Sequence, residues 1–158
     1  MSRRIPVDGP VLVSACLAGR ECTYQGTDRA NAEVLRLVAE GRAVLVCPEE
    51  EAGLGTPRPE AEISDGTGAD VLDRATGVRT IDGVDVTDEY LEGARIATER
   101  AKRTGCTAAI LKARSPACGC GEIYDGSFEG KLRDGDGVAA AALRRAGIDV
   151  MTDEEVSP

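Results

Sequence analysis

The chain has no histidine and no tryptophan, and it has only one phenylalanine and three tyrosines among 158 residues. The absence of histidine excludes Ser-His-Asp and Cys-His catalysis, Cys2His2 zinc sites and the histidine–carboxylate sites of non-haem iron. Any general base must therefore be Asp, Glu, Lys, Tyr, Cys or water. With so few aromatic residues, we expect the hydrophobic core to be built from Val, Leu, Ile and Ala.

Long apolar runs and an excess of positive charge are also missing. No segment approaches the roughly 20 apolar residues of a membrane span. The opening "MSRRIPVDGP" has two arginines but no apolar stretch after them, which argues against a signal peptide. The net charge of −9 argues against a nucleic-acid polymer or an anionic membrane as partner, although a few local cations can still hold a small nucleotide-like ligand. We expect a cytoplasmic protein.

Strands and helices alternate in the predicted fold. Four short apolar runs predict buried strands, at residues 10–15, 43–47, 106–113 and 148–152. Three segments with helical periodicity lie between them, at residues 28–40, 87–104 and 135–147. This order predicts an α/β fold in which an open parallel sheet of about four strands is flanked by helices. The length suits a single domain, residues 1–158, with its core at about 11–151.

Two segments do not follow this alternation. Residues 48–63 carry three prolines and two glycines, which indicates a loop. Residues 69–86 alternate apolar and polar positions around "ATG" and "IDG", which predicts one or two small hairpins at an edge of the sheet.

Three of the six cysteines follow predicted strands. Cys16 comes directly after the first strand, Cys47 closes the second, and Cys118 lies in the loop after the third. Because the carboxyl ends of parallel strands meet at one edge of a sheet, we expect these thiols to lie together there. Cysteines in a cytoplasmic protein favour metal or redox chemistry over disulfides.

Other interpretations of the cysteines remain open. Free cysteine is often a small core residue, and we expect Cys106 to be one. Cys22 and Cys120 lie in loops, where they can be ligands, neighbours of ligands or incidental. Three thiolates can hold zinc with one open position, or three irons of a [4Fe-4S] cluster with the fourth iron open. Spacing alone does not separate zinc from iron–sulfur.

Five motifs, taken together and in this order, resemble the thiouracil desulfidase family. They are "VSACLAGRECTYQG", "VCPEEEAGLGTPRPEAEI", "DVTDEYLEGA", "AILKARSPACGCGEIYDGSFEG" and "GDGVAAAAL". The resemblance implies a compact Rossmann-like α/β fold and a [4Fe-4S] cluster bound by three cysteines, with one iron lacking a protein ligand. It also implies removal of sulfur from thiouracil or thio-UMP, giving the uracil compound and hydrogen sulfide. By motif, the cluster ligands are Cys16, Cys47 and Cys118.

The sequence departs from the family pattern at four positions beside these motifs. Gln25 stands where the family has Asp in "YDG", and Ala117 replaces the middle serine of "SPSCG". Glu50 and Glu51 occur where the family has "PEVLGGL". The three cluster cysteines are retained, so these changes bear on the fit of the substrate rather than on the cofactor.

Four residues are candidates for catalysis of the desulfidation that the resemblance implies. Water has to attack the thiocarbonyl carbon, and Glu49, two residues after Cys47, is the candidate base. Ser14, Lys112 and Ser115 are candidates to donate hydrogen bonds to the ring oxygen or to the cluster sulfurs. Three of them have a plainer alternative, which is backbone hydrogen bonding in a turn for Glu49 and Ser115 and a solvated charge for Lys112.

Three further residues are candidates for binding a small thiolated pyrimidine. Tyr24 and Tyr124 occur in matching "Y-x-G" contexts and can stack on a base or simply pack, and Arg58 can meet a substrate phosphate or form a structural salt bridge. The alternative functions are an iron–sulfur sulfurtransferase and a non-catalytic zinc or redox-sensing module. Sulfurtransferases that modify tRNA need a basic surface, which this acidic chain lacks. We expect a monomer or a small homo-oligomer.

Overall fold

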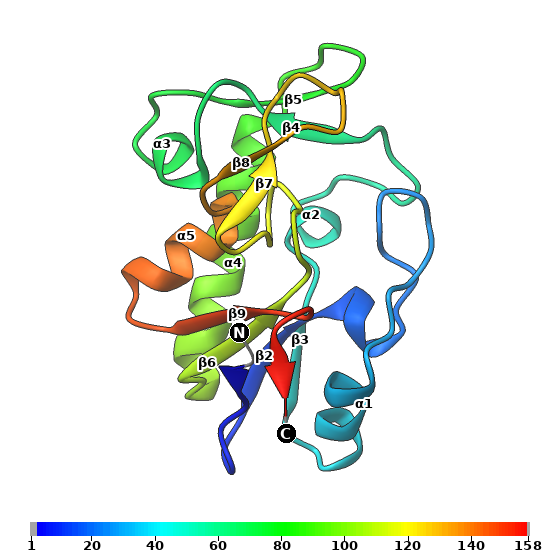
Figure 1. Ribbon diagram of the computed structural model, residues 1–158, viewed down its shortest axis with the longest axis vertical. Coiled ribbons are helices and arrows are strands. Elements are labelled where there is room, and N and C mark those ends of the chain that lie inside the picture. The colour runs from blue at the N-terminus through cyan, green and yellow to red at the C-terminus, as the bar shows by residue number, and fades with distance from the viewer. Residues whose placement is uncertain (1–2, 158) are drawn as a thin grey trace.

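A four-stranded parallel sheet forms the centre of the computed structural model, which describes residues 3–157 (Figure 1). In spatial order, its strands are β3 (Ala43–Val46), β2 (Val11–Ser14), β6 (Ala108–Leu111) and β9 (Asp149–Thr152). All three pairings are parallel, which confirms the predicted sheet. Residues 1–2 and 158, at the ends of the expected domain, lie outside the described residues.

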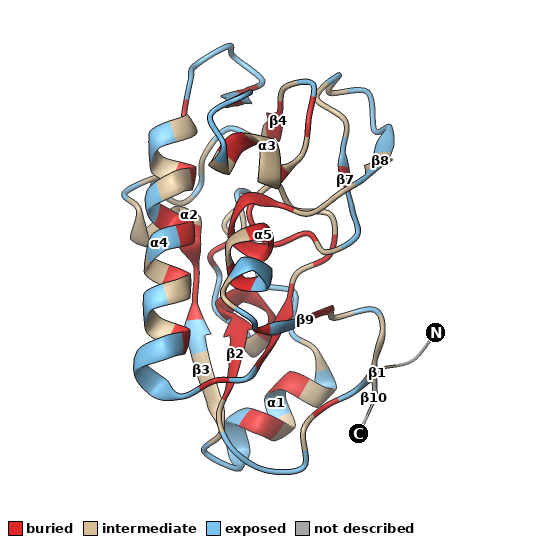
Figure 2. Ribbon diagram, turned by 90° about the vertical axis from the view of Figure 1, so that its left-hand side faces the viewer, coloured by how far each residue is buried: buried red, intermediate tan, exposed pale blue. Residues whose placement is uncertain are grey.

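Helices cover both faces of this sheet. Helix α1 (Ala32–Ala39) lies on one face, and α4 (Thr87–Thr104) and α5 (Val138–Arg145) lie on the other. The shorter helices α2 (Pro48–Glu51) and α3 (Gly68–Leu72) pack against α4 and α5, and a short 3-10 turn η1 (Ala15–Ala18) follows β2. Alternate side chains of β2 enter different cores, because Leu12 packs with α4 and α5 whereas Val11 and Val13 pack with α1. Figure 2 shows these buried segments between the helices. None of the described helices is both long and apolar enough to cross a bilayer.

Three two-stranded pairs complete the fold. They are β1 (Arg3–Arg4) with β10 (Val156–Ser157), β4 (Ala61–Ile63) with β5 (Val78–Thr80), and β7 (Glu122–Tyr124) with β8 (Leu132–Asp134). The β4–β5 and β7–β8 pairs are antiparallel and lie beyond the carboxyl end of the main sheet (Figure 1). The sequence predicted neither of these two pairings.

Three predicted segments differ from the structure. The helix expected over 28–40 begins only at Ala32. The Asn31 side chain caps it by accepting the backbone N–H groups of Glu33 and Val34. Asp28 instead accepts the N–H of Ala30, in a turn before the helix. The segment 48–63 was expected to be a loop, but it opens with α2 and ends in β4. Segment 69–86 contains most of α3, and its strand β5 pairs with β4 instead of forming its own hairpin.

Helix α2 approaches α4 through a backbone contact at Gly93. A Cβ on this glycine would lie 2.6 Å from the carbonyl oxygen of Pro48. We expect Gly93→Ala to lower the free energy of unfolding, because overpacking costs about 1–3 kcal/mol and outweighs the gain in helix propensity, about 1 kcal/mol. Urea unfolding measures the change. Gly55→Ala is the matched control, since nothing lies within 4 Å of its Cβ. A Gly93→Ala protein as stable as wild type would contradict this close approach.

Candidate functional site

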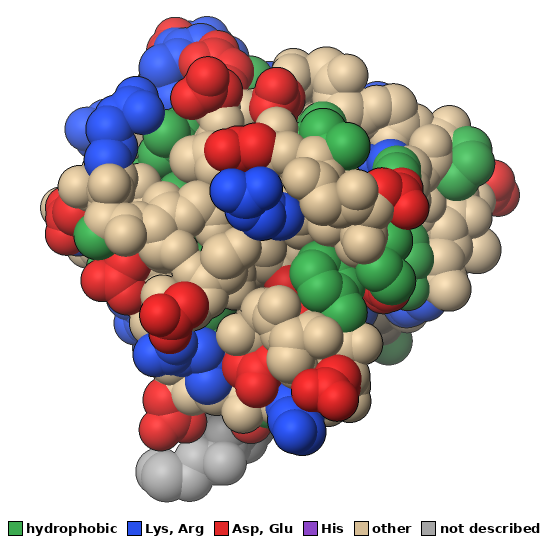
Figure 3. Space-filling model, turned by 90° about the horizontal axis from the view of Figure 1, so that it is seen from above, with side chains coloured by type: hydrophobic (Ala, Val, Ile, Leu, Met, Phe, Trp, Pro, Cys, Tyr) green, Lys and Arg blue, Asp and Glu red, His purple; other side chains and the backbone are tan. Residues whose placement is uncertain are grey.

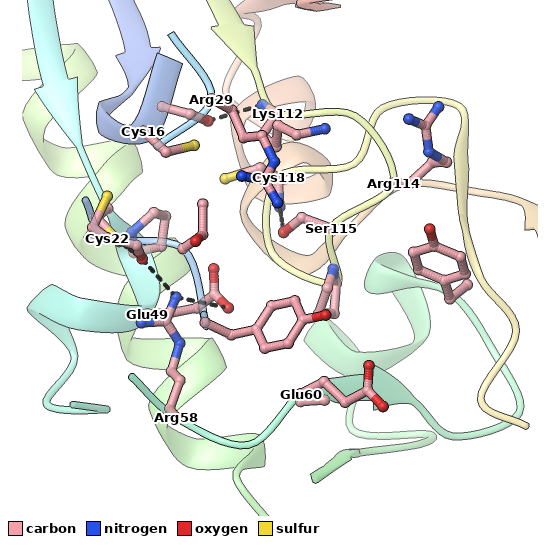
Figure 4. Close-up of a pocket in the computed structure, with 18 of the residues that line it drawn as sticks. Cys16, Cys22, Arg29, Glu49, Arg58, Glu60, Lys112, Arg114, Ser115 and Cys118 are labelled. Atoms are coloured by element: carbon pink, nitrogen blue, oxygen red, sulfur yellow. Dashed lines mark hydrogen bonds and ion pairs between the residues drawn. The ribbon is translucent and has the colours of Figure 1, made fainter. Parts of the chain in front are cut away.

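A cavity of about 470 Å³ opens beyond the carboxyl ends of β2, β3 and β6 (Figure 4). Ser14 and Cys16 reach it from the end of β2, Cys47 from the end of β3, and Lys112 from the end of β6. The β4 strand and the β7–β8 hairpin line its other side. The cavity therefore occupies the edge of the sheet where the strand order predicted a ligand site.

Four cysteines line this cavity. Cys16, Cys47 and Cys118 all line it, together with Cys22 from the loop after η1. Figure 4 shows Cys16, Cys22 and Cys118 around the cavity. All four are buried and free. The Cys47 thiol donates to the Cys22 carbonyl oxygen at 3.7 Å. The sequence left the role of Cys22 open, and the structure places it among the other three thiols.

The other two cysteines lie away from the cavity. Cys106 is buried in the core next to Thr104, which confirms its predicted core position. Cys120 accepts a hydrogen bond from Nη2 of Arg144 at 2.7 Å, on the far side of the loop that carries Cys118. The two cysteines of "CGC" therefore lie in different environments, Cys118 in the cavity and Cys120 beside Arg144.

The thiols of Cys22, Cys47 and Cys118 have pKa values above that of an ordinary cysteine. Hydrogen bonding with Cys16 raises the pKa of Cys22 to about 11. Burial, followed by the charge of Glu49, raises the pKa of Cys118 to about 12. The hydrogen bond with Cys22 and then burial raise the pKa of Cys47 far above its usual range. Metal or cluster binding requires thiolates, so it would release these protons.

The thiol donors of the cavity suit a soft metal or an iron–sulfur cluster. Within residues 3–157, no three Cys, Asp or Glu side chains come close enough together to share one ion. Zn–S bonds of about 2.3 Å would require the thiolates of one zinc to lie roughly 4 Å from one another. A cluster distributes its thiolates over separate irons, so they stand farther apart.

Glu49 is a half-buried carboxylate at the edge of the cavity. It lies in α2, directly after Pro48, with 15% of its side chain exposed. The Tyr90 hydroxyl donates to its Oε2 at 2.9 Å, and Nη2 of Arg58 lies 3.5 Å from the same oxygen. Burial, followed by the charge of Glu49, raises the pKa of Tyr90 well above its usual range, so Tyr90 remains a donor. The Glu49 carboxylate is thus held in one position by two side chains.

Arg58 is the ion-pair partner of Glu49. Only 8% of its side chain is exposed, and it also donates to the Cys22 carbonyl oxygen at 2.9 Å and to Thr56. Arg58 was considered either as a phosphate-binding residue or as part of a structural salt bridge, and these contacts correspond to the salt bridge. The backbone-binding role considered for Glu49 belongs instead to Glu51, whose Oε2 accepts the N–H of Cys47.

The other candidate catalytic residues surround Cys118. The Ser14 hydroxyl accepts the backbone N–H of Lys112 at 2.9 Å, and a hydrogen bond with it partly offsets the raised pKa of Cys118. The Ser115 hydroxyl accepts the backbone N–H groups of Ala117 and Cys118 at 3.1 and 3.0 Å. This is the turn role considered for Ser115, and its own O–H remains able to donate into the cavity.

Every aromatic residue of the chain lines this cavity. They are Tyr24, Tyr90, Tyr124 and Phe128. Tyr90 is buried, whereas Tyr24 and Tyr124 are 39% and 36% exposed. The sequence singled out Tyr24 and Tyr124 but not Phe128. Planar aromatic walls suit a planar ring as ligand.

Two cations of the cavity have no acidic partner. Arg29 donates to Gln25 Oε1 and to Thr27, and Lys112 donates to the Ala113 carbonyl oxygen, but neither forms an ion pair with a described carboxylate. Gln25 thus orients an arginine of the cavity. Elsewhere, the face seen from above carries Lys and Arg interspersed with Asp and Glu, so no basic field covers it (Figure 3).

Comparisons with known proteins agree with this site. A family model described as 2-thiouracil desulfurase matches residues 11–155. The chain belongs to this 2-thiouracil desulfurase family. Uncharacterized protein YbbK of Bacillus subtilis (strain 168) is 46% identical over 147 residues, 93% of this chain and 97% of that protein. The resemblance predicted from the motifs is therefore confirmed.

A solved structure is similar over nearly the same span. The [4Fe-4S]-dependent thiouracil desulfidase TudS matches with a TM-score of 0.82 and 40% sequence identity, covering 93% of this chain and 92% of that one. This match confirms the predicted Rossmann-like α/β fold of the desulfurase chain.

Proposed function

We propose that this chain is an iron–sulfur enzyme that removes sulfur from thiolated uracil derivatives, giving the uracil compound and hydrogen sulfide. Its family and its likeness to a [4Fe-4S]-dependent thiouracil desulfidase support this function. The observation that carries it is the meeting of Cys16, Cys47 and Cys118 with all four aromatic side chains in one cavity.

In this proposal Cys16, Cys47 and Cys118 hold a [4Fe-4S] cluster, and one iron has no protein ligand. When bound, the open iron supplies a soft Lewis acid that polarises the thiocarbonyl group. Cys22 lies beside two of the ligands through its contacts with Cys16 and Cys47. The six free cysteines fit a reducing compartment, which supports a location in the cytoplasm.

The side chains around the cavity bind the substrate ring and move the protons of the attacking water. Tyr24 and Tyr124 contact the ring from the cavity wall. Glu49 takes a proton from the attacking water while Tyr90 and Arg58 keep its carboxylate in place. The water oxygen becomes the new carbonyl oxygen of the ring, and the sulfur leaves as hydrogen sulfide with the two water protons.

Ser14, Ser115 and Lys112 act as donors in this scheme. All three line the cavity beside Cys118, so they can hydrogen-bond the ring oxygens or the cluster sulfurs.

The cavity supports a nucleotide as well as a free base. A volume of about 470 Å³ is large enough for more than one ring. Arg29 and Lys112 supply cations that no described carboxylate neutralises, and cations of this kind bind phosphate. We therefore propose that thio-UMP is a substrate beside thiouracil.

Anaerobic reconstitution with iron and sulfide tests this function. We expect a brown protein that converts 2-thiouracil, 4-thiouracil or 4-thio-UMP, with one sulfide released for each thiocarbonyl absorbance lost. The protein without the cluster is the control and is expected to be inactive. A brown protein that releases no sulfide from any of the three would contradict the desulfidase reaction. A colourless protein with stoichiometric zinc would contradict the cofactor.

A further inference from the structure

The loop between β7 and β8 closes one side of the cavity. Tyr124, Phe128 and Gly130 of this hairpin line the cavity. Phe128 has a φ of 58°, a left-handed conformation that bulky residues rarely adopt. Such a conformation persists only where the surroundings impose it. Something in the structure must therefore hold the backbone at the only phenylalanine of the chain.

Glu62 is the group that holds it. The Glu62 Oε1 atom accepts the backbone N–H of Gly126 at 2.9 Å and that of Phe128 at 3.1 Å. Glu62 is only 6% exposed, and no described cation forms an ion pair with it. A buried carboxylate is costly unless it is hydrogen-bonded, so these two amides offset its burial. The bonds tie the hairpin loop to β4.

The loop backbone also lies directly on β4. A Cβ on Gly126, which has a φ of 97°, would come within 2.5 Å of the Ile63 carbonyl oxygen. Only glycine therefore fits at this point. Asp125 closes the adjoining turn by accepting the N–H and hydroxyl of Ser127 at 2.9 and 2.6 Å. The loop is a fixed wall of the cavity.

We propose that Phe128 contacts the ring of the substrate and sets its affinity, and that Glu62 is the positioning residue that fixes Phe128. This inference rests on the proposed function, because it takes the ligand to be a pyrimidine. Aromatic side chains bind bases by stacking on their faces. A stacking wall contributes fully only when it is preorganised, which is the role of the two bonds to Glu62.

Ring affinity tests the role of Phe128. We expect Phe128→Ala to raise both KM for 4-thiouracil and the calorimetric Kd for uracil about 5- to 100-fold, the usual effect of losing one base-stacking side chain. The value of kcat should change less than about threefold, since the chemistry lies at Glu49 and the cluster. Phe128→Leu, which keeps an apolar side chain without the ring, should also lose affinity. Glu129→Gln, in the same loop, is the control.

Variants of Glu62 test its positioning role. Both hydrogen bonds end on one oxygen, so the amide oxygen of Glu62→Gln can accept them, and we expect near-wild-type affinity. Glu62→Ala loses both bonds and should weaken uracil binding as Phe128→Ala does. In the double variant Glu62→Ala/Phe128→Ala, the two effects should not add, because one residue acts through the other.

The outcomes separate this inference from the proposed function. Wild-type affinity for uracil in Phe128→Ala would overturn the ring contact and leave desulfidation intact. Additive losses in the double variant, or no rescue by Glu62→Gln, would overturn the positioning role. If Glu62→Ala does not fold, Phe128→Leu still tests the ring contact of Phe128, and Glu62→Gln still tests the positioning role of Glu62. Failure of the wild type to release sulfide would count against the proposed function alone, because uracil binding is measured independently of turnover.

Discussion

Alanine at Cys16, Cys47 or Cys118 is expected to abolish the iron–sulfur cluster and, with it, desulfidation. In the proposed site each thiolate supplies the only protein bond to one iron, and no histidine is available to replace it. Iron and acid-labile sulfide per chain should fall from about four each, the content of one [4Fe-4S] cluster, to background. The brown absorbance should disappear in parallel. Both measurements are independent of activity.

Three other cysteines provide the controls. Cys106 is in the core and Cys120 is bonded to Arg144, so alanine at either should leave the iron content unchanged. Cys22→Ala is the sharper comparison, because Cys22 shares the cavity. We expect it to retain the cluster. Complete loss of iron in Cys22→Ala would contradict the assignment of three ligands, as would full iron content in Cys118→Ala.

Strand ends were the part of the site that the sequence predicted best. Short apolar runs marked β2, β3 and β6, and parallel pairing then requires the residues that follow them to share one edge. The positions of Cys16 and Cys47 follow from local pattern and topology, whereas Cys118 lies in the loop beyond β6, where the Ser115 turn holds it. The long helix α4 was also predicted at both ends, from Thr87 to its stop at Gly105 with a φ of 78°.

Loop residues could not be placed in this way. Cys22, Arg58 and Glu62 reach the cavity through contacts between segments far apart in the chain. The β4–β5 pair joins strands separated by α3, and no local turn signal indicates that pairing. Periodicity reports which face of an element is buried, but it does not report which loops meet.

The scarcity of aromatic residues is the one compositional signal that bears on Phe128, the cavity residue that the sequence analysis missed. Aromatic residues normally contribute much of a hydrophobic core. Here the core is aliphatic apart from Tyr90, and all four aromatic residues border the cavity. Phe128 was not singled out from the sequence. The scarcity of aromatics could have drawn attention to it, but its place in the fold depends on the contact with Glu62.

Glu49→Gln is expected to lower kcat about 10²- to 10⁴-fold, the usual contribution of a general base. The amide has the shape of the carboxylate and can still accept the Tyr90 hydroxyl, but it cannot take a proton from water. Iron content and KM should stay close to wild type, because Glu49 is not a proposed ligand. Anaerobic turnover of 4-thiouracil by variants with equal iron content measures the effect.

Glu50→Gln is the matched control for this variant. Glu50 occupies the next position of α2, but it pairs with Arg20 at 2.8 Å and accepts the Thr56 hydroxyl. The Glu50→Gln variant should change kcat less than about twofold, since surface ion pairs contribute little. If Glu49→Gln behaves the same way, the proton of the attacking water goes elsewhere, and the Glu49–Arg58–Tyr90 group serves only to fix α2 beside the cluster cysteines. A loss confined to Glu49 assigns the base, because the two variants remove the same charge one residue apart.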